Sequence, residues 1–236
     1  MNDLTRPEAI DPGRRAFLKA GAVAGGGLLI GFHLPLTNRA GEAAAAATGF
    51  APNAWIRIDA DDTVTLRIAS SEMGQGVYTA IPMLLAEELE CDWARIKVEM
   101  APADKAYFNP LIGMQLTGGS TAVRAFWTPL RQAGAAARDL LLRAAAQTWK
   151  VKEDECRAEN GVVLHKTSNL KASYGDLAAK AATLPVPSEV FLKEPGEFKL
   201  IGKSTARLDT PLKVNGSAVF GMDVKLPGLL TAVVAR

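Results

Sequence analysis

Two glycine-rich turns are the features of this sequence best suited to chemistry. They are Gly74-Gln75-Gly76 and Gly118-Gly119-Ser120-Thr121, and a stretch with helical periodicity follows each one. Because glycine has no side chain, backbone N–H groups can crowd toward a bound anion, and a helix N-terminus adds partial positive charge. The side chains of Gln75, Ser120 and Thr121 can add hydrogen bonds. Both turns are therefore candidate binding sites for a phosphorylated cofactor.

The two turns match no established phosphate-binding motif. The lysine of a P-loop and the Gly-x-Gly-x-x-Gly of a dinucleotide-binding fold are both missing. Glycines before a helix are also common in plain connections between a strand and a helix, so the turns alone leave both interpretations open. Glu72, beside the first turn, is expected to be structural.

Other candidate residues are few, and we assign no catalytic residue and no metal ligand. Cys91 and Cys156 are the two cysteines, and their spacing does not suit zinc or an iron–sulfur cluster. We expect both to be small buried apolar residues, with a disulfide as the alternative. His33 and His165 are expected to have no catalytic or metal-binding role.

Composition indicates a globular protein and argues against a nucleic-acid partner. The chain has 236 residues, a formal net charge of +2, 48% hydrophobic residues and 22% charged residues. Binding to phosphate backbones needs a concentrated basic face, but no run of basic residues exceeds Arg14-Arg15.

The first 48 residues have the pattern of an export signal. Arg14-Arg15 and Lys19 precede an uncharged, glycine-rich stretch at 20–36 and an alanine-rich stretch at 43–47. This order resembles a twin-arginine signal, which exports proteins already folded around a cofactor. We therefore expect residues 1–48 to direct the protein to the periplasm or to the periplasmic face of the inner membrane. An uncleaved anchor, or a chance pair of arginines, is the alternative.

Apolar periodicity predicts alternating strands and helices. Glu87, Glu88 and Glu90 are expected to form the solvent-facing side of the first helix, and residues 134–137 are small enough for a close helix contact. The segment at 185–194 is expected to be a linker. The expected elements are a hairpin at 55–68, a helix at 78–89, a strand at 96–100, a long helix after 121, a hairpin at 155–164 turning at Asn160-Gly161, a short helix at 173–182, and strands at 198–201, 218–220 and 229–234.

The order of several motifs closely resembles the xanthine dehydrogenase family. Within that family the chain looks most like the large subunits of the isoquinoline 1-oxidoreductase and aldehyde dehydrogenase branch. The motifs that carry this resemblance are residues 71–76, 85–89, 115–120, 135–138 and 144–146. Gly202, Arg207-Leu208-Asp209, residues 213–218 and Asp223 resemble the start of the family's α/β hammerhead domain.

The resemblance implies an α+β fold and a cofactor. It implies a molybdopterin-binding portion at 49–184, the linker at 185–194 and an incomplete hammerhead domain at 195–236. Molybdopterin, with the cytosine dinucleotide form as one candidate, is then expected to contact Gly74, Gln75 and Gly76 and the later Gly118, Gly119, Ser120 and Thr121.

The same resemblance implies a reaction and partners. The family hydroxylates N-heteroaromatic rings or oxidises aldehydes, and passes electrons to a small subunit with [2Fe–2S] clusters. A cytochrome c is a candidate final acceptor. The family's catalytic glutamate lies near the C-terminus of the full-length chain, beyond Arg236, so this chain alone is expected to be inactive. The alternatives are a non-catalytic exported remnant and a binding module for another phosphorylated ligand.

Overall fold

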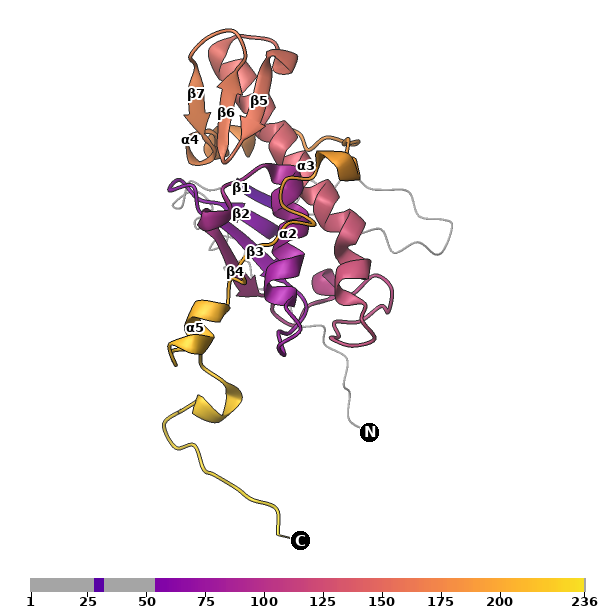
Figure 1. Cartoon of the computed structure of the whole chain (residues 1–236), viewed down its shortest axis with the longest axis vertical. Helices are drawn as coiled ribbons and strands as arrows, with labels where there is room; N and C mark the ends of the chain where they lie inside the picture. Colours follow the sequence, from indigo (N-terminus) through magenta and orange to yellow (C-terminus); the bar gives the residue numbers. More distant parts are fainter. Residues whose placement is uncertain (1–27, 32–53, 236) are drawn as a thin grey trace, which may run out of the picture.

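The computed structural model describes residues 28–31 and 54–235, and it confirms the α+β class. A four-stranded sheet lies against two long helices, and a small three-stranded sheet with a short helix lies beyond them (Figure 1). Apart from residues 28–31, the predicted export signal falls outside the described residues. Those four residues form strand β1 (Leu28–Gly31), which pairs antiparallel with β2.

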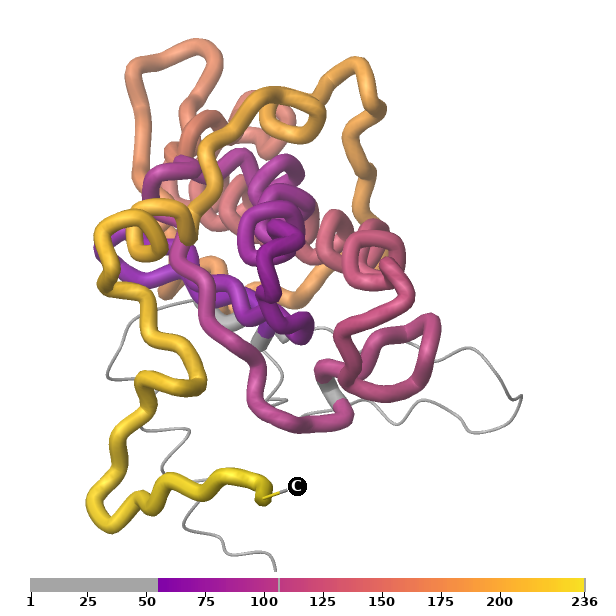
Figure 2. The backbone as a smooth tube through the Cα atoms, turned by 60° about the horizontal axis from the view of Figure 1, so that its bottom comes forward, coloured from indigo at the N-terminus to yellow at the C-terminus, as the bar shows by residue number. Residues whose placement is uncertain are grey.

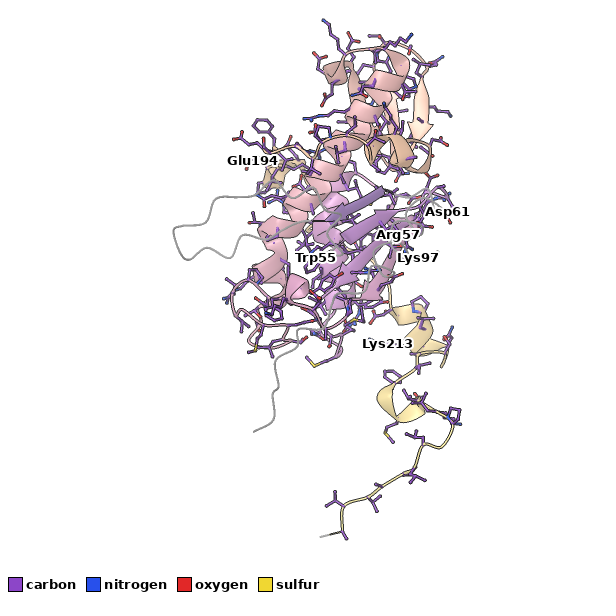
Figure 3. All side chains as sticks on the ribbon, turned by 180° about the vertical axis from the view of Figure 1, so that it is seen from behind. Trp55, Arg57, Asp61, Lys97, Glu194 and Lys213 are labelled. Carbon is purple, nitrogen blue, oxygen red and sulfur yellow. The ribbon has the colours of Figure 1, made fainter. Side chains whose placement is uncertain are left out.

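The main sheet has the order β1-β2-β3-β4. Strands β2 (Ala54–Ile58) and β3 (Val64–Ile68) form the predicted antiparallel hairpin, and β4 (Ile96–Met100) pairs parallel to β3. A parallel pair needs a crossover connection, which helix α2 (Val77–Leu89) provides. Arg57 and Lys97 lie on the face of the sheet that is turned away from the long helices (Figure 3).

Helix α2 packs closely against α3 (Ala122–Trp149), the longest helix of the described chain. The closest approach is at Gly134, where an added Cβ would lie 2.4 Å from the backbone oxygen of Leu85. Such a distance leaves no room for any side chain, which confirms the prediction of a close contact at 134–137. The spacing of the two helices is therefore set by the glycine.

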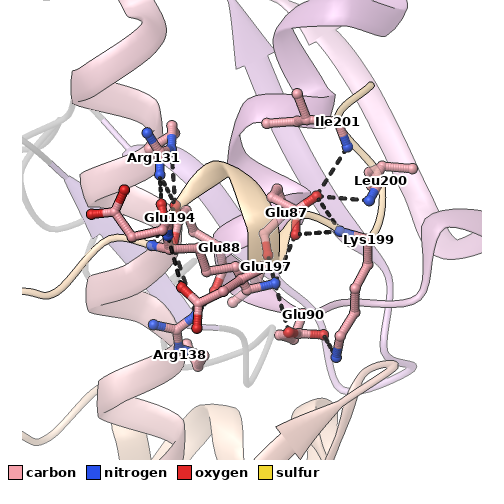
Figure 4. A network of polar contacts seen from close by, with 12 residues as sticks. Glu87, Glu88, Glu90, Arg131, Arg138, Glu194, Glu197, Lys199, Leu200 and Ile201 are labelled. Carbon is pink, nitrogen blue, oxygen red and sulfur yellow. Dashed lines mark hydrogen bonds and ion pairs between the residues drawn. The ribbon is translucent and has the colours of Figure 1, made fainter. Parts of the chain in front are cut away.

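The prediction that Glu87 and Glu88 face solvent was wrong. Their exposed fractions are 2% and 0%, because the segment at 191–201, here called the strap, crosses over them (Figure 4). Glu88 Oε1 lies 2.7 Å from Arg131 Nη2 of α3, and Glu87 Oε1 lies 2.7 Å from Lys193 Nζ. Burial raises the pKa of Glu87, but Lys193 and the strap amides outweigh it and hold that pKa below its ordinary value. Periodicity could not reveal partners about 110 residues away.

The small sheet follows α3 and is largely as predicted. Strands β5 (Cys156–Glu159) and β6 (Val162–His165) form the hairpin, and Asn160 and Gly161 have the positive φ angles that its turn requires. A third strand, β7 (Lys171–Ser173), was not predicted. Helix α4 (Tyr174–Ala181) begins where the Ser173 side chain accepts a hydrogen bond from the Asp176 backbone N–H. Both cysteines are free; Cys156 is buried as expected, whereas Cys91 is only partly buried.

The C-terminal region departs most from prediction. Residues 185–194 contain no helix or strand, as expected, but the strand predictions for 198–201, 218–220 and 229–234 were wrong. A strand needs a neighbouring backbone to bond with, and no described residue offers one to these segments. Residues 210–235, here called the C-terminal arm, instead extend away from the body with Met222 98% exposed (Figure 2). The arm contains α5 (Thr210–Val214) and a 3-10 turn (Gly221–Asp223); the other 3-10 turns are Trp93–Arg95, Lys105–Tyr107, Glu153–Glu155 and Pro195–Glu197.

Candidate functional site: a pocket between two glycine turns

The two glycine turns meet at one pocket of about 360 Å³, here called the glycine-turn pocket. They are joined where the Ser71 backbone N–H donates to Thr117 Oγ1 at 2.8 Å. The fold thus brings four predicted site residues to one place, while Gly74, Gly76 and Gly119 do not line it. The lining residues are Met73, Gln75, Val77, Thr117, Gly118, Ser120, Thr121, Ala122 and Val123.

The first turn wraps around a carboxylate of the chain itself. Glu72 Oε1 accepts the backbone N–H groups of Gly74 at 2.7 Å and Gly76 at 3.0 Å, and its Oε2 accepts that of Tyr78 at 2.9 Å. These N–H groups were expected to face a ligand, but they are directed at Glu72. Glu72 therefore caps α2 at its N-terminus, which agrees with its expected structural role.

These hydrogen bonds fix the charge state of Glu72. Burial raises the pKa of its carboxyl, but the hydrogen bonds from Tyr78, Gly76 and Gly74 outweigh burial and hold that pKa below its ordinary value. Glu72 is thus an anion that occupies the positive end of α2, and it leaves little of that end for a second anion.

Gln75 lies at the rim of the pocket with its side-chain amide already bonded. Its Nε2 donates to the backbone oxygen of Ser71 at 2.9 Å, and its Oε1 accepts the Met73 backbone N–H at 2.6 Å. Both partners belong to the same exposed turn. A ligand that binds Gln75 has to share or replace these local hydrogen bonds.

The second turn leaves the N-terminus of α3 open. Gly119 and Ser120 both have left-handed backbones, with φ angles of 60° and 51°. The Thr121 hydroxyl donates to the Gly118 oxygen at 2.9 Å and accepts from Asn109 Nδ2 at 2.9 Å, so it does not cap the helix. The first turn of α3 carries an exposed cation, Arg124, and no acidic residue. An anion bound at this end would interact favourably with the positive end of the helix dipole and with the free backbone N–H groups.

Sequence reasoning missed Asn109 and Arg207 as parts of this region. Asn109 holds Thr121 from the irregular loop before α3, and it is 2% exposed. Arg207 reaches the first turn from 133 residues downstream, where its Nη1 donates to the Gly74 oxygen at 3.1 Å. Neither lies in a local pattern that points to the turns.

Outside the glycine-turn pocket, the described histidine has only local partners. His165 Nδ1 lies 2.8 Å from Ser168 Oγ and its Nε2 lies 3.3 Å from Glu155 Oε2, at the end of the small hairpin. Among residues 28–31 and 54–235, no group of three or more His, Cys, Asp or Glu side chains is arranged to hold a metal ion. Within the same ranges, no helix has the length and apolar character needed to cross a membrane.

Three curated relatives are similar to this chain. The beta chain of the isoquinoline 1-oxidoreductase of Brevundimonas diminuta is 35% identical and aligns with 97% of this chain and 34% of its own length. The membrane-bound aldehyde dehydrogenase [pyrroloquinoline-quinone] of Gluconacetobacter polyoxogenes is 32% identical over 95% of this chain and 29% of its own. A nicotinate dehydrogenase subunit of Pseudomonas putida is 26% identical over 77% and 15%.

The chain therefore spans about a third or less of the length of these relatives. A family model described as molybdopterin cofactor-binding domain matches residues 15–225, which include both glycine turns, the strap and residues 210–225 of the C-terminal arm. This match and the three relatives confirm the resemblance to the xanthine dehydrogenase family, and the chain belongs to the molybdopterin cofactor-binding domain family.

Proposed function

We propose that this chain is the molybdopterin-binding part of the large subunit of an exported molybdenum hydroxylase, and that the glycine-turn pocket holds the cofactor. The observation that carries the proposal is the meeting of two glycine turns at one pocket beside the uncapped N-terminus of α3. The family assignment supplies the chemical class of the ligand.

The residues of the pocket fit an anionic ligand. The polar side chains that line it are the amide of Gln75 and the hydroxyls of Thr117, Ser120 and Thr121, and none of the lining residues is acidic. The exposed guanidinium of Arg124 lies in the first turn of α3. Hydroxyl and amide donors together with a helix N-terminus are the groups that bind phosphate and similar anions.

In this proposal, the chain's own residues bind and orient the cofactor. The molybdenum cofactor supplies two-electron redox chemistry when bound. The Ser120 hydroxyl and the backbone of Gly118, which line the pocket, hold its anionic end, and Gln75 hydrogen-bonds to it from the opposite turn. We assign no proton transfer to any described residue, and Glu72 is excluded because its carboxylate is committed to the α2 backbone.

The names of the relatives and the predicted export signal support proposals for the substrate, the partners and the location. The relatives' names refer to isoquinoline, aldehyde and nicotinate, which supports hydroxylation of an N-heteroaromatic ring or oxidation of an aldehyde. Two of the relatives are named as single subunits, which supports a multi-subunit enzyme. We propose a small [2Fe–2S] subunit as partner, a cytochrome c as acceptor and the cytosine dinucleotide form of molybdopterin as cofactor. We also propose a location in the periplasm or at the periplasmic face of the inner membrane, reached by twin-arginine export.

The direct test is cofactor content. The full chain is produced in a host that makes molybdenum cofactor, purified, and assayed for molybdenum and for pterin fluorescence. Ser120→Glu places a carboxylate in the pocket, and Ser120→Gln is its uncharged control of equal size. We expect the wild type to retain pterin and molybdenum, the Glu variant to lose most of both, and the Gln variant to lose less.

Two results would count against the proposal. If the wild-type chain carries no more pterin than an unrelated purified protein, the pocket does not hold the cofactor. Equal losses in the Glu and Gln variants would show that the pocket does not select for negative charge. A retained phosphorylated compound without molybdenum would instead favour a binding module for another ligand.

A further inference from the structure

Arg207 connects a distant part of the chain to the first glycine turn. Its Nη2 donates to Glu72 Oε1 at 3.2 Å, and its Nη1 donates to the Gly74 oxygen at 3.1 Å. On its other side, Nε and Nη2 donate to Asp209 Oδ1 and Oδ2, both at 3.1 Å. One guanidinium therefore binds both the carboxylate inside the turn and the backbone of the turn.

The position of Arg207 is itself fixed. Asp209 is 7% exposed and also pairs with Lys213 of α5. The neighbouring Leu208 backbone N–H donates to the buried Thr79 Oγ1 of α2 at 3.0 Å. The segment at 207–209 is thus attached to the first turn of α2 independently of the guanidinium, which can then act on Glu72 from a defined place.

The carboxylates of Glu72 and Asp209 are both poorly solvated, so a cation beside them stabilises their charged forms. The side chains of Glu72 and Asp209 are only 10% and 9% exposed. Within the described chain, Arg207 is the one cation that pairs with Glu72. Removing it would leave the poorly solvated Glu72 carboxylate without a paired cation and Asp209 with Lys213 alone, so the turn would have to open to let water reach Glu72.

We infer that Arg207 is a positioning residue for the glycine-turn pocket. It holds Glu72 in place, Glu72 holds the N–H groups of Gly74, Gly76 and Tyr78, and the turn so fixed presents Gln75 at the rim of the pocket. The consequence for cofactor binding rests on the proposed function, whereas the ordering of the turn does not.

Amide hydrogen exchange on the full chain tests the ordering directly. Arg207→Met removes the charge and the donors but keeps a long side chain, and Arg207→Lys restores the charge without the planar fork. Arg157→Met is the matched control, since Arg157 makes an exposed ion pair with Glu159 on the small sheet. Exchange at Gly74, Gly76 and Tyr78 is followed together with the thermal midpoint of each variant.

We expect Arg207→Met to speed exchange at these three amides by about fivefold or more, the factor that corresponds to one ordinary hydrogen bond. Arg207→Lys should restore part of the protection, and Arg157→Met should change nothing in the turn. Unchanged exchange in Arg207→Met would overturn the inference. So would faster exchange spread evenly over the molecule, because that pattern indicates general destabilisation.

A second readout separates this inference from the proposed function. Pterin content is measured for the same variants from the cofactor-producing host, and Arg207→Met should retain less than the wild type. If the wild type retains no pterin, the proposed function fails while the exchange data still decide the role of Arg207. If the wild type and Arg207→Met retain equal amounts, the ordered turn does not serve the pocket and the inference is overturned.

Discussion

The N-termini of α2 and α3 begin in similar ways in sequence but differ in the finished fold. Each helix follows a glycine-rich turn, and the two turns line one pocket. The α2 end is filled by Glu72, which accepts three backbone hydrogen bonds. The α3 end has no side-chain cap and carries Arg124 in its first turn.

This difference shows that a glycine turn before a helix does not by itself mark a ligand site. The positive end of a helix attracts any anion, and a carboxylate from the same chain serves as well as a cofactor. The α2 turn is therefore a wall of the pocket whose amides are already hydrogen-bonded, and the α3 turn is the part left available for a ligand. The following changes disturb this contrast, beginning with the largest expected effect.

Gly134→Ala should push α2 and α3, the two helices being compared, away from each other. The new Cβ would lie 2.4 Å from the Leu85 oxygen, so the helices must shift apart. Overpacking costs about 3 kcal/mol, and the better helix propensity of alanine returns about 1 kcal/mol. We expect the free energy of unfolding, measured in urea, to fall by about 2 kcal/mol. Gln132→Ala, at an exposed position of the same helix, is the control and should show almost no loss.

Glu72→Ala should make the α2 end resemble the α3 end. Loss of a helix cap lowers the free energy of unfolding by about 1 kcal/mol. The freed N–H groups should then accept an external anion, so added sulfate should raise the melting temperature of Glu72→Ala more than that of the wild type. Glu159→Ala, on the exposed edge of the small sheet, should respond to sulfate as the wild type does. An equal response of all three proteins would mean that the α2 end stays closed without Glu72.

The contribution of Glu72 to the free energy of unfolding should decrease at acidic pH. The pKa of Glu72 is lowered on folding, so its contribution to stability is present above the unfolded value of 4.5 and is lost as the pH falls through the lower folded value. The difference in free energy of unfolding between wild type and Glu72→Gln should therefore be constant near neutral pH and shrink below pH 4.5. A difference that grows on acidification would contradict the role of the ionised carboxylate.

Thr121→Asp should give α3 an anion of its own, and its effect is the smallest. A carboxylate at the N-cap stabilises a helix by about 0.5 kcal/mol, and Asn109 can still donate to it. Compared with the neutral Thr121→Asn, the Asp variant should melt at a slightly higher temperature without cofactor and should retain less pterin. Identical pterin content in the two variants would argue that the α3 end is not where the ligand's charge lies.

Local features of the fold could be predicted because their causes are local. Alternating apolar residues indicated the β2–β3 hairpin, Asn160-Gly161 indicated the tight turn between β5 and β6, and Gly134 indicated the close contact of the helices. Four of the candidate site residues, Gln75, Gly118, Ser120 and Thr121, do line one pocket. Their roles in binding remain predictions.

Partners distant in sequence could not be predicted. Glu87 and Glu88 were expected to face solvent because the strap that buries them comes about 105 to 114 residues later. The apolar runs of the C-terminal arm were expected to be strands, although a strand forms only where another backbone supplies hydrogen bonds.

The sequence by itself determined the family, the α+β class and the two turns where a cofactor is expected, since these follow from motifs and short-range periodicity. Only the tertiary structure decided that the turns share a pocket, that Glu72 fills one helix end while the other stays open, and that Arg207 hydrogen-bonds to Glu72 and Gly74 of the first turn. The physical reason is that hydrogen bonds and ion pairs depend on distances in space, and the pairs that matter here join residues up to 135 positions apart.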